Sequence, residues 1–181
     1  GIDIKKFKFN ELKSLIGYVP QNAFLFSENI EDNIKFGEIN ATNLEVEKAA
    51  KNACVHNNII DFKDGYKTLV GERGVTLSGG QIQRISIARA LIKKSKILIL
   101  DDCLSAVDNE TEKEILSNLK VLCENKTTII VSHRVSSIKH ADKILVIENG
   151  MIIQQGIHKE LIKENGYYKE LHKKQKTEKT N

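Results

Sequence analysis

The sequence predicts an α/β fold in which helices flank a mostly parallel sheet. Residues 96–101 and 127–131 each contain a continuous aliphatic run, which is the pattern of strands buried on both faces. Four apolar residues at helical spacing predict a helix between these runs: Ile115, Leu116, Leu119 and Leu122. A strand, a helix and a strand in this order form a parallel βαβ unit, and such sheets bind ligands at the carboxyl ends of their strands.

The composition indicates one domain of ordinary size without a strongly charged partner. The 181 residues carry 28 Lys and Arg against 24 Asp and Glu, a net charge of +4. Because these charges are scattered rather than clustered on one stripe, we expect no nucleic-acid partner. Only residues 173–179 form a basic run, and we interpret it as a solvated, frayed terminus.

The sequence contains neither a membrane span nor a cysteine framework. Its longest aliphatic stretch, residues 97–100, is far short of the ~20 residues that cross a bilayer. Cys54, Cys103 and Cys123 are odd in number and lack CxxC spacing. We therefore expect them to be small core residues in a reducing, cytosolic compartment rather than members of a disulfide or a zinc site.

The N-terminal half predicts one strand followed by short helices. Residues 15–19 are apolar and are closed by a proline, which lacks the N–H that a ladder needs, so Gln21 lies at a strand exit. A short helix is expected around residues 30–36. A Thr-x-x-Glu spacing then predicts a capped helix over residues 42–54. Residues 70–75 read as a loop, with glycines bracketing a charged pair.

The C-terminal part predicts a hairpin and a helix. Residues 143–147 and 151–155 flank Asn149-Gly150, a dipeptide suited to a type I′ turn because both positions need positive φ. A helix over residues 158–173 follows, with an interruption near Asn165-Gly166.

A glycine-opened helix is expected over residues 78–92. Ser78 has the position of an N-cap, and Gly79 and Gly80 allow the backbone to approach an anion closely. The free N–H groups of a helix start attract phosphate, to which the Ser78 hydroxyl could also bond. A simple helix cap explains the same residues, so this segment alone decides nothing.

Three further side chains lie at predicted strand ends. Asp101 ends a buried strand and is a candidate Mg²⁺ ligand. Asp102 could point the other way along the pleat and orient or deprotonate an attacking water. His133 follows the second strand and could bond a terminal phosphate. The plain alternatives are two acids before a turn and a structural histidine.

Together these motifs resemble the nucleotide-binding domain of ATP-binding cassette (ABC) proteins. The resemblance begins with the signature segment (residues 77–81), continues with Asp101-Asp102 and ends with Ser132-His133. Residues 17–21 resemble the family's glutamine loop, and residues 105–108 resemble its dimer loop, which follows the strand.

A further loop points to one branch of the family. Residues 70–74 are similar to the loop that marks exporter-type members. The resemblance implies that Glu72 and Arg73 in this loop touch the coupling helices of a transmembrane domain. It places the domain, itself soluble, at the cytoplasmic face of a membrane.

The resemblance implies a fold like that of the P-loop NTPases, with two parts. Residues 22–92 would form a small helical subdomain that carries the exporter loop and the signature helix. Residues 93–181 would form the rear of the catalytic core, with the C-terminal hairpin and helix.

The resemblance also implies a site for ATP and Mg²⁺ built by two such domains that close head to tail. Gln21 would sense the γ-phosphate and Mg²⁺, Asp101 would hold Mg²⁺ through water, and His133 would be the switch histidine. The signature residues would bind the ATP held by the second domain, and Asp108 belongs to the nucleotide site through the dimer loop. These signature residues are Ser78, Gly79, Gly80 and Gln81.

Two features depart from the family pattern. No Gly-Lys dipeptide occurs, so the phosphate loop GxxxxGK[ST] is absent. The family places this loop upstream of Gly1, so we expect a partial domain that lacks its N-terminal strands and phosphate-loop helix, leaving apolar surface uncovered and this chain alone inactive. Asp102 stands where hydrolysing members carry glutamate, which withdraws the carboxylate by ~1.5 Å.

These observations predict the ATPase domain of an ABC exporter, with Asp102 marking the degenerate half of a heterodimer. Misplacement by about 1 Å can cost on the order of 100-fold in rate, so we expect slow hydrolysis at this chain's own site. Two alternatives remain open at this stage. One is an ABC ATPase that acts on DNA or the ribosome without a membrane part, and the other is a non-catalytic regulatory module that binds nucleotide.

Overall fold

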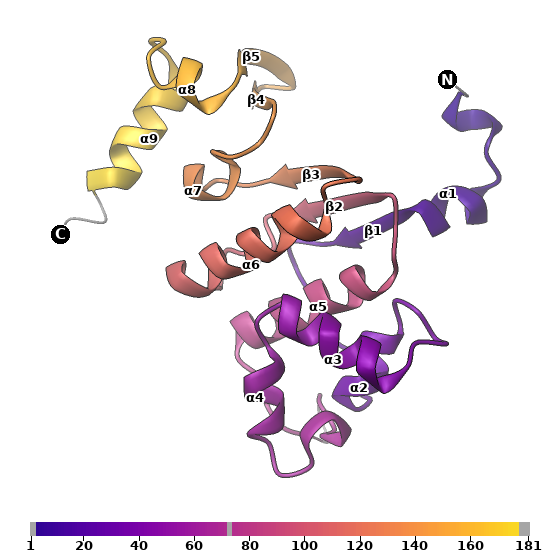
Figure 1. The fold of residues 1–181 in the computed structure, drawn as a ribbon. Helices are drawn as coiled ribbons and strands as arrows, with labels where there is room; N and C mark the ends of the chain where they lie inside the picture. Colours follow the sequence, from indigo (N-terminus) through magenta and orange to yellow (C-terminus); the bar gives the residue numbers. More distant parts are fainter. Residues whose placement is uncertain (1–2, 72–73, 178–181) are drawn as a thin grey trace. The chain divides into compact units, whose positions relative to one another are not determined.

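The computed structural model describes residues 3–71 and 74–177 and divides the chain into two compact units. The first unit is Gly1–Val131 and the second is Ser132–Asn181. Figure 1 shows the elements of both, and each unit is described by itself.

A parallel sheet of three strands organises the first unit. β1 (Ile16–Val19), β2 (Ile97–Asp101) and β3 (Thr127–Val131) lie in the order β1-β2-β3 and pair in parallel. The predicted βαβ unit is confirmed, since α6 (Asn109–Leu122) connects β2 to β3. The register aligns Asp101 with Val131, so the carboxyl ends of these two strands meet at one edge.

The two faces of this sheet differ in burial. On one face Val19, Leu98 and Leu100 are buried in a core shared with α5 (Gly79–Ile92) and α6. On the opposite face Tyr18 and Val131 remain 52% and 50% exposed. The expectation of uncovered apolar surface is therefore confirmed at this sheet face.

Short helices pack on α5 to form the helical region of the first unit (Figure 1). The predicted helices appear as α2 (Ile30–Lys35) and α3 (Asn43–Asn52), and the latter begins with the expected capping box. Two further elements of this region were not predicted: α4 (His56–Ile60) and the 3₁₀ helix η2 (Gly65–Lys67).

The half-buried side chain of Arg89 joins α5 to this region. The Arg89 guanidinium donates hydrogen bonds to the Asn33 carbonyl oxygen at 2.8 Å and to Asn33 Oδ1 at 2.9 Å. Burial lowers the pKa of Arg89 from its ordinary value. Because three acceptors, including the Phe24 carbonyl at 3.1 Å, satisfy its fork of donors, the guanidinium is stable in this half-buried position.

The chain before β1 also contains helices that the sequence pattern did not predict. These are the 3₁₀ helix η1 (Ile4–Lys6) and α1 (Phe9–Leu15), neither of which buries a residue. In α1, Phe9, Leu12 and Leu15 recur at helical spacing, but its 7 residues are too few to establish a periodic signal.

In the second unit, the residues that the structure describes (132–177) form a hairpin and three helices. β4 (Ile144–Glu148) and β5 (Met151–Gly156) pair in antiparallel fashion, while α7 (Val135–Ile138) precedes them and α8 (His158–Leu161) follows. The type I′ turn is confirmed by φ of +50° at Asn149 and +77° at Gly150. A register irregularity between Val146 and Ile147 interrupts the ladder. The buried core residues of this unit are Val135, Ile144, Leu161 and Tyr168.

The C-terminal helix continues further than predicted. The interruption near Asn165-Gly166 is confirmed, and α9 (Tyr167–Thr177) begins directly after it. Residues 173–177 are helical, so the interpretation of this run as a frayed end is wrong for them. The reason is tertiary: Gln175 is half-buried and hydrogen-bonds to backbone groups near His133. No helix in the described residues is both long and apolar enough to cross a bilayer.

Candidate functional site

The carboxyl ends of β1 and β2 bring Gln21, Asp101 and Asp102 together, as the sequence predicted. Gln21 Nε2 lies 3.5 Å from Asp102 Oδ2, and the Tyr18 hydroxyl donates a hydrogen bond to Asp101 Oδ2 at 3.1 Å. This hydrogen bond to the Asp101 carboxylate raises the pKa of Tyr18. The edge of the sheet therefore carries two carboxylates and one amide within reach of each other.

Asp102 does not follow the pleat as expected. β2 ends at Asp101, and Asp102 has φ of +42°, in the left-handed region that aspartate tolerates better than most residues. Its backbone N–H donates to the Val131 carbonyl at 2.9 Å, which ties this turn to β3. The prediction that strand alternation directs the Asp102 side chain is wrong, because the extended backbone has already ended.

The donor set at this edge fits a magnesium nucleotide by its chemistry. Mg²⁺ takes oxygen ligands and is held in nucleotide sites by one or two carboxylates together with phosphates and water. Asp101, Asp102 and the Gln21 amide offer such oxygens. Among the described residues no group of three or more His, Cys, Asp or Glu side chains is placed to hold a metal ion.

The signature segment forms the exposed tip of α5. Ser78 is the N-cap: its Oγ accepts a hydrogen bond from the Gln81 N–H at 3.2 Å, and Gln81 Oε1 accepts one from the Ser78 N–H at 2.9 Å. Ser78 and Gly79 are exposed. Because the hydroxyl acts as an acceptor in this cap, its proton can still be donated to a phosphate oxygen.

Gly80 brings this tip against the dimer loop. A Cβ at Gly80 would lie 2.9 Å from the Ala106 carbonyl oxygen, closer than real Cβ contacts come. The sequence explained this glycine by approach to an anion, whereas the structure gives a different reason, which is contact with residues 105–108. The signature segment and the dimer loop are therefore one packed assembly.

Gln83 is a buried residue of this assembly that the sequence interpretation missed. Its Nε2 donates to Ser105 Oγ at 3.2 Å, and its Oε1 accepts from the Ala106 N–H at 3.0 Å. A polar residue at an otherwise apolar helical position, two residues after the signature glutamine, was the available signal. Gln83 holds the dimer loop to α5 through both ends of one amide.

Asp108 caps the helix that follows the dimer loop. Its Oδ1 accepts hydrogen bonds from the Glu110 N–H at 3.1 Å and the Thr111 N–H at 3.0 Å, at the start of α6. The hydrogen bonds from Thr111 lower the pKa of Asp108. The carboxylate is therefore charged at neutral pH and fixes the end of the dimer loop.

His133 belongs to the second unit, where its side chain is exposed. The Ser132 hydroxyl accepts a hydrogen bond from the Arg134 N–H at 3.0 Å, which turns the chain directly after β3. Glu72 and Arg73, the residues expected to touch coupling helices, lie outside the described residues.

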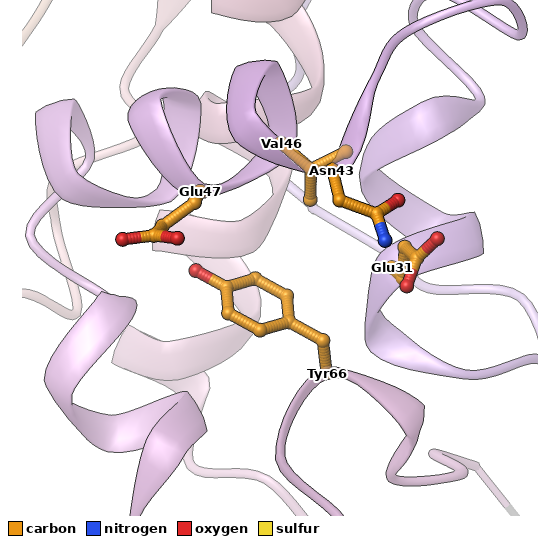
Figure 2. A pocket seen from close by; sticks show the side chains of 5 residues that line it. All are labelled: Glu31, Asn43, Val46, Glu47 and Tyr66. Atoms are coloured by element: carbon orange, nitrogen blue, oxygen red, sulfur yellow. The ribbon is translucent and has the colours of Figure 1, made fainter.

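One pocket lies in the helical region, away from the strand ends. It measures about 120 Å³, and Figure 2 shows the Tyr66 hydroxyl directed toward the Glu47 carboxylate, with Glu31 and Asn43 on the other side. Burial raises the pKa of Tyr66 to about 12, so the phenol stays neutral. Glu31 is paired with Lys35 at 2.6 Å and with Lys67 at 3.0 Å. The first pair lies within α2 and the second joins α2 to η2, so we assign the pocket a structural role.

Comparison with known proteins identifies relatives along almost the whole chain. The family model described as "ABC transporter" matches residues 1–105. ATP-binding cassette sub-family B member 6 of Xenopus tropicalis is 45% identical over 98% of this chain and 21% of its own length. The multidrug resistance-like ATP-binding protein MdlA of Buchnera aphidicola is 53% identical over 93% of this chain and 29% of its own.

A solved structure agrees with these matches. The structure of a bacterial Atm1-family ABC exporter with ATP bound superposes with a TM-score of 0.92 and 41% identity, covering 97% of this chain and 31% of that one. The chain thus spans between 21% and 31% of the length of these three relatives. The predicted α/β fold of the ABC ATPase type is confirmed.

Proposed function

The chain belongs to the ABC transporter family, and on that premise we propose that it is the ATP-binding domain of an exporter at the cytoplasmic face of a membrane. Its relatives include an Atm1-family exporter and a multidrug resistance-like protein, which support an exporter over an ATPase acting on DNA or the ribosome. The domain couples ATP-driven pairing with a second such domain to transport.

The exposed tip of α5 is the observation that carries this proposal. Ser78 and Gly79 are exposed at the start of α5. This helix start packs against Ala106, whose N–H donates a hydrogen bond to Gln83. Helix starts favour phosphate through their N–H groups and dipole. The tip, with Gly80 and Gln81, accepts the triphosphate held by a second domain, and the dimer loop with Asp108 follows it into the interface.

The strand ends supply the chemistry of this chain's own nucleotide site. Asp101 would hold Mg²⁺ through water, Gln21 would sense the γ-phosphate and Mg²⁺, and His133 would contact the γ-phosphate. The metal, when bound, neutralises charge on the phosphate oxygens. Asp102 orients the attacking water and accepts its proton. Glu72 and Arg73 contact the coupling helices of the membrane-spanning part.

Asp102 makes this site the weaker one of a heterodimeric pair. Aspartate is one methylene shorter than glutamate, and the left-handed backbone at Asp102 starts the side chain from a turn rather than from a strand. Its carboxylate therefore reaches the water less well than that of a glutamate would, while the signature tip of this chain serves the partner's more active site.

Replacement of Asp102 by Glu in the full-length transporter tests this assignment. We expect ATP turnover at this site to rise, by up to about 100-fold if the missing ångström of reach limits the rate. The measurement is single-turnover hydrolysis with the partner site inactivated. Asp142→Glu, the same change at an exposed position of the second unit, is the matched control and should leave turnover unchanged.

Two outcomes would contradict separate parts of the proposal. A domain that binds ATP but gains no turnover from Asp102→Glu contradicts the weak-base assignment and favours a non-catalytic regulatory module. A transporter in which Ser78→Asp leaves ATPase activity intact contradicts the role of the signature tip.

A further inference from the structure

One glutamine of the C-terminal helix α9 forms two hydrogen bonds with the backbone next to His133. Gln175 Nε2 donates a hydrogen bond to the His133 carbonyl oxygen at 2.7 Å. Gln175 Oε1 accepts one from the Val135 N–H at 2.9 Å. A single side-chain amide therefore pairs with the backbone on both sides of Arg134.

The residues around His133 depend on this amide for part of their order. α7 begins at Val135, and its N-cap residue Arg134 forms no side-chain cap. The first N–H groups of a helix lack partners within the helix, and Gln175 supplies one for Val135 from another element. The exposed residue His133 thus lies on a backbone segment whose position is fixed by hydrogen bonds from Gln175.

α9 is itself fixed at its other end. The Tyr168 side chain is only 2% exposed, its hydroxyl hydrogen-bonds His158 Nδ1 at 2.8 Å, and its backbone N–H donates to Gln154 Oε1 at 3.1 Å. Tyr168, Leu171 and Gln175 recur at helical spacing on one face. Gln175 is two turns from Tyr168, about 10 Å along the axis, so the helix connects the hairpin and α8 to the His133 segment.

We propose that Gln175 is a positioning residue for His133 and that α9 thereby belongs to the ATPase machinery. The inference rests on the proposed contact between His133 and the γ-phosphate. Gln175 touches neither nucleotide nor metal in this scheme. It fixes the carbonyl of His133 and the start of α7, and so limits the directions in which the imidazole can point.

Two replacements of Gln175 in the full-length transporter separate this role from simple helix capping. Gln175→Met keeps the length of the side chain and removes both hydrogen bonds. Gln175→Glu keeps the acceptor for the Val135 N–H but loses the donor to the His133 carbonyl. We expect both to lower kcat, by about 10-fold or more, since displacement by 1 Å can cost on the order of 100-fold. The KM for ATP should change little, because Gln175 itself touches neither nucleotide nor metal.

Two further kinetic measurements complete the test, one on a control variant and one on Gln175→Met combined with His133→Ala. Lys174→Met, at an exposed neighbouring position of α9, should leave kcat unchanged. In a His133→Ala background Gln175→Met should cause no further loss, because a residue that acts through another is not additive with it. Equal losses in both backgrounds, or wild-type kcat in Gln175→Glu, would overturn the inference.

Amide hydrogen exchange distinguishes failure of this inference from failure of the proposed function. Gln175→Met should speed exchange of the Val135 amide while that of Leu161, in the core of the same unit, is retained. Unchanged exchange at Val135 overturns the positioning role. If exchange responds but His133→Ala keeps full turnover, the proposed role of His133 fails, and with it the catalytic part of the inference.

Discussion

Gly79 and Gly80 are neighbours at the tip of α5 that face different surroundings. A Cβ at Gly80 would lie 2.9 Å from the Ala106 carbonyl oxygen, whereas one at Gly79 would lie 3.6 Å from Ala106 Cβ. The first distance requires the dimer loop to move, and the second is an ordinary van der Waals contact. Two adjacent glycines that look equivalent in the sequence thus have unequal physical roles.

This difference predicts unequal effects of alanine. Gly80→Ala should lower the free energy of unfolding by about 1–3 kcal/mol through overpacking against Ala106. Gly79→Ala, the matched control, should be neutral or stabilising by up to about 1 kcal/mol, because alanine is the better helix former. Urea unfolding followed by far-UV circular dichroism measures both. Equal stability of the two variants would contradict the close contact at Gly80.

At the scale of elements, the N-cap residue of α5, Ser78, has both a structural role and a proposed functional role. The Ser78 hydroxyl accepts from the Gln81 N–H within the helix, and the proposed function assigns its proton to a phosphate of the second domain. The sequence left the cap and the phosphate site as alternatives. The reciprocal bonds between Ser78 and Gln81 confirm the cap, and the phosphate site remains a prediction.

Two replacements of Ser78 separate these demands. Ser78→Ala removes the cap and should cost about 1 kcal/mol of stability together with ATPase activity. Ser78→Asp keeps a capping oxygen but places a carboxylate where the proposal puts phosphate, so activity should fall while stability is retained. Thermal unfolding and ATP turnover of both variants check the expectation. Full activity in Ser78→Asp would leave the cap as the sole role of this serine.

At the scale of the whole molecule, the second unit contains a titratable cluster that makes its stability depend on pH. Burial, and then the charges of His172, Lys139 and His140, lower the pKa of His158 below its ordinary value of 6.5. On α9 the His172 ring lies 5.5 Å from that of His158, and Tyr168 forms its hydrogen bond to Nδ1. The folded unit therefore disfavours the protonated imidazole.

The sign of the effect follows from proton linkage. Around and below pH 6.5 the unfolded chain binds a proton at His158 more readily than the folded unit does, so stability is retained above this pH and falls as the pH decreases. We expect faster amide exchange at Leu161 and Tyr168 at pH 5.5 than at pH 7.5, after correction for intrinsic rates. His158→Asn, whose amide can still bond the Tyr168 hydroxyl, should flatten this dependence. An unchanged pH response in that variant would contradict the assignment to His158.

Local pattern was sufficient for much of the fold. Aliphatic runs predicted β2 and β3, the Asn-Gly turn predicted the hairpin, and capping spacings predicted α3 and α5. Short helices such as α1 and α4 escaped prediction because an apolar period does not extend over enough turns in them. The prediction that Gln21, Asp101 and Asp102 lie at strand ends also located them correctly at one edge of the sheet. Parallel strands direct their carboxyl ends the same way.

By itself the sequence determined the order of elements, the family resemblance and which residue types gather at the strand ends, because periodicity, turn chemistry and strand direction act over a few neighbouring residues. Tertiary structure alone decided that Gln83 holds a loop 22 residues away, that Gln175 holds the backbone 42 residues away, and that Asp102 leaves the strand with a left-handed backbone. These features come from hydrogen bonds and packing between distant segments, which no local pattern encodes.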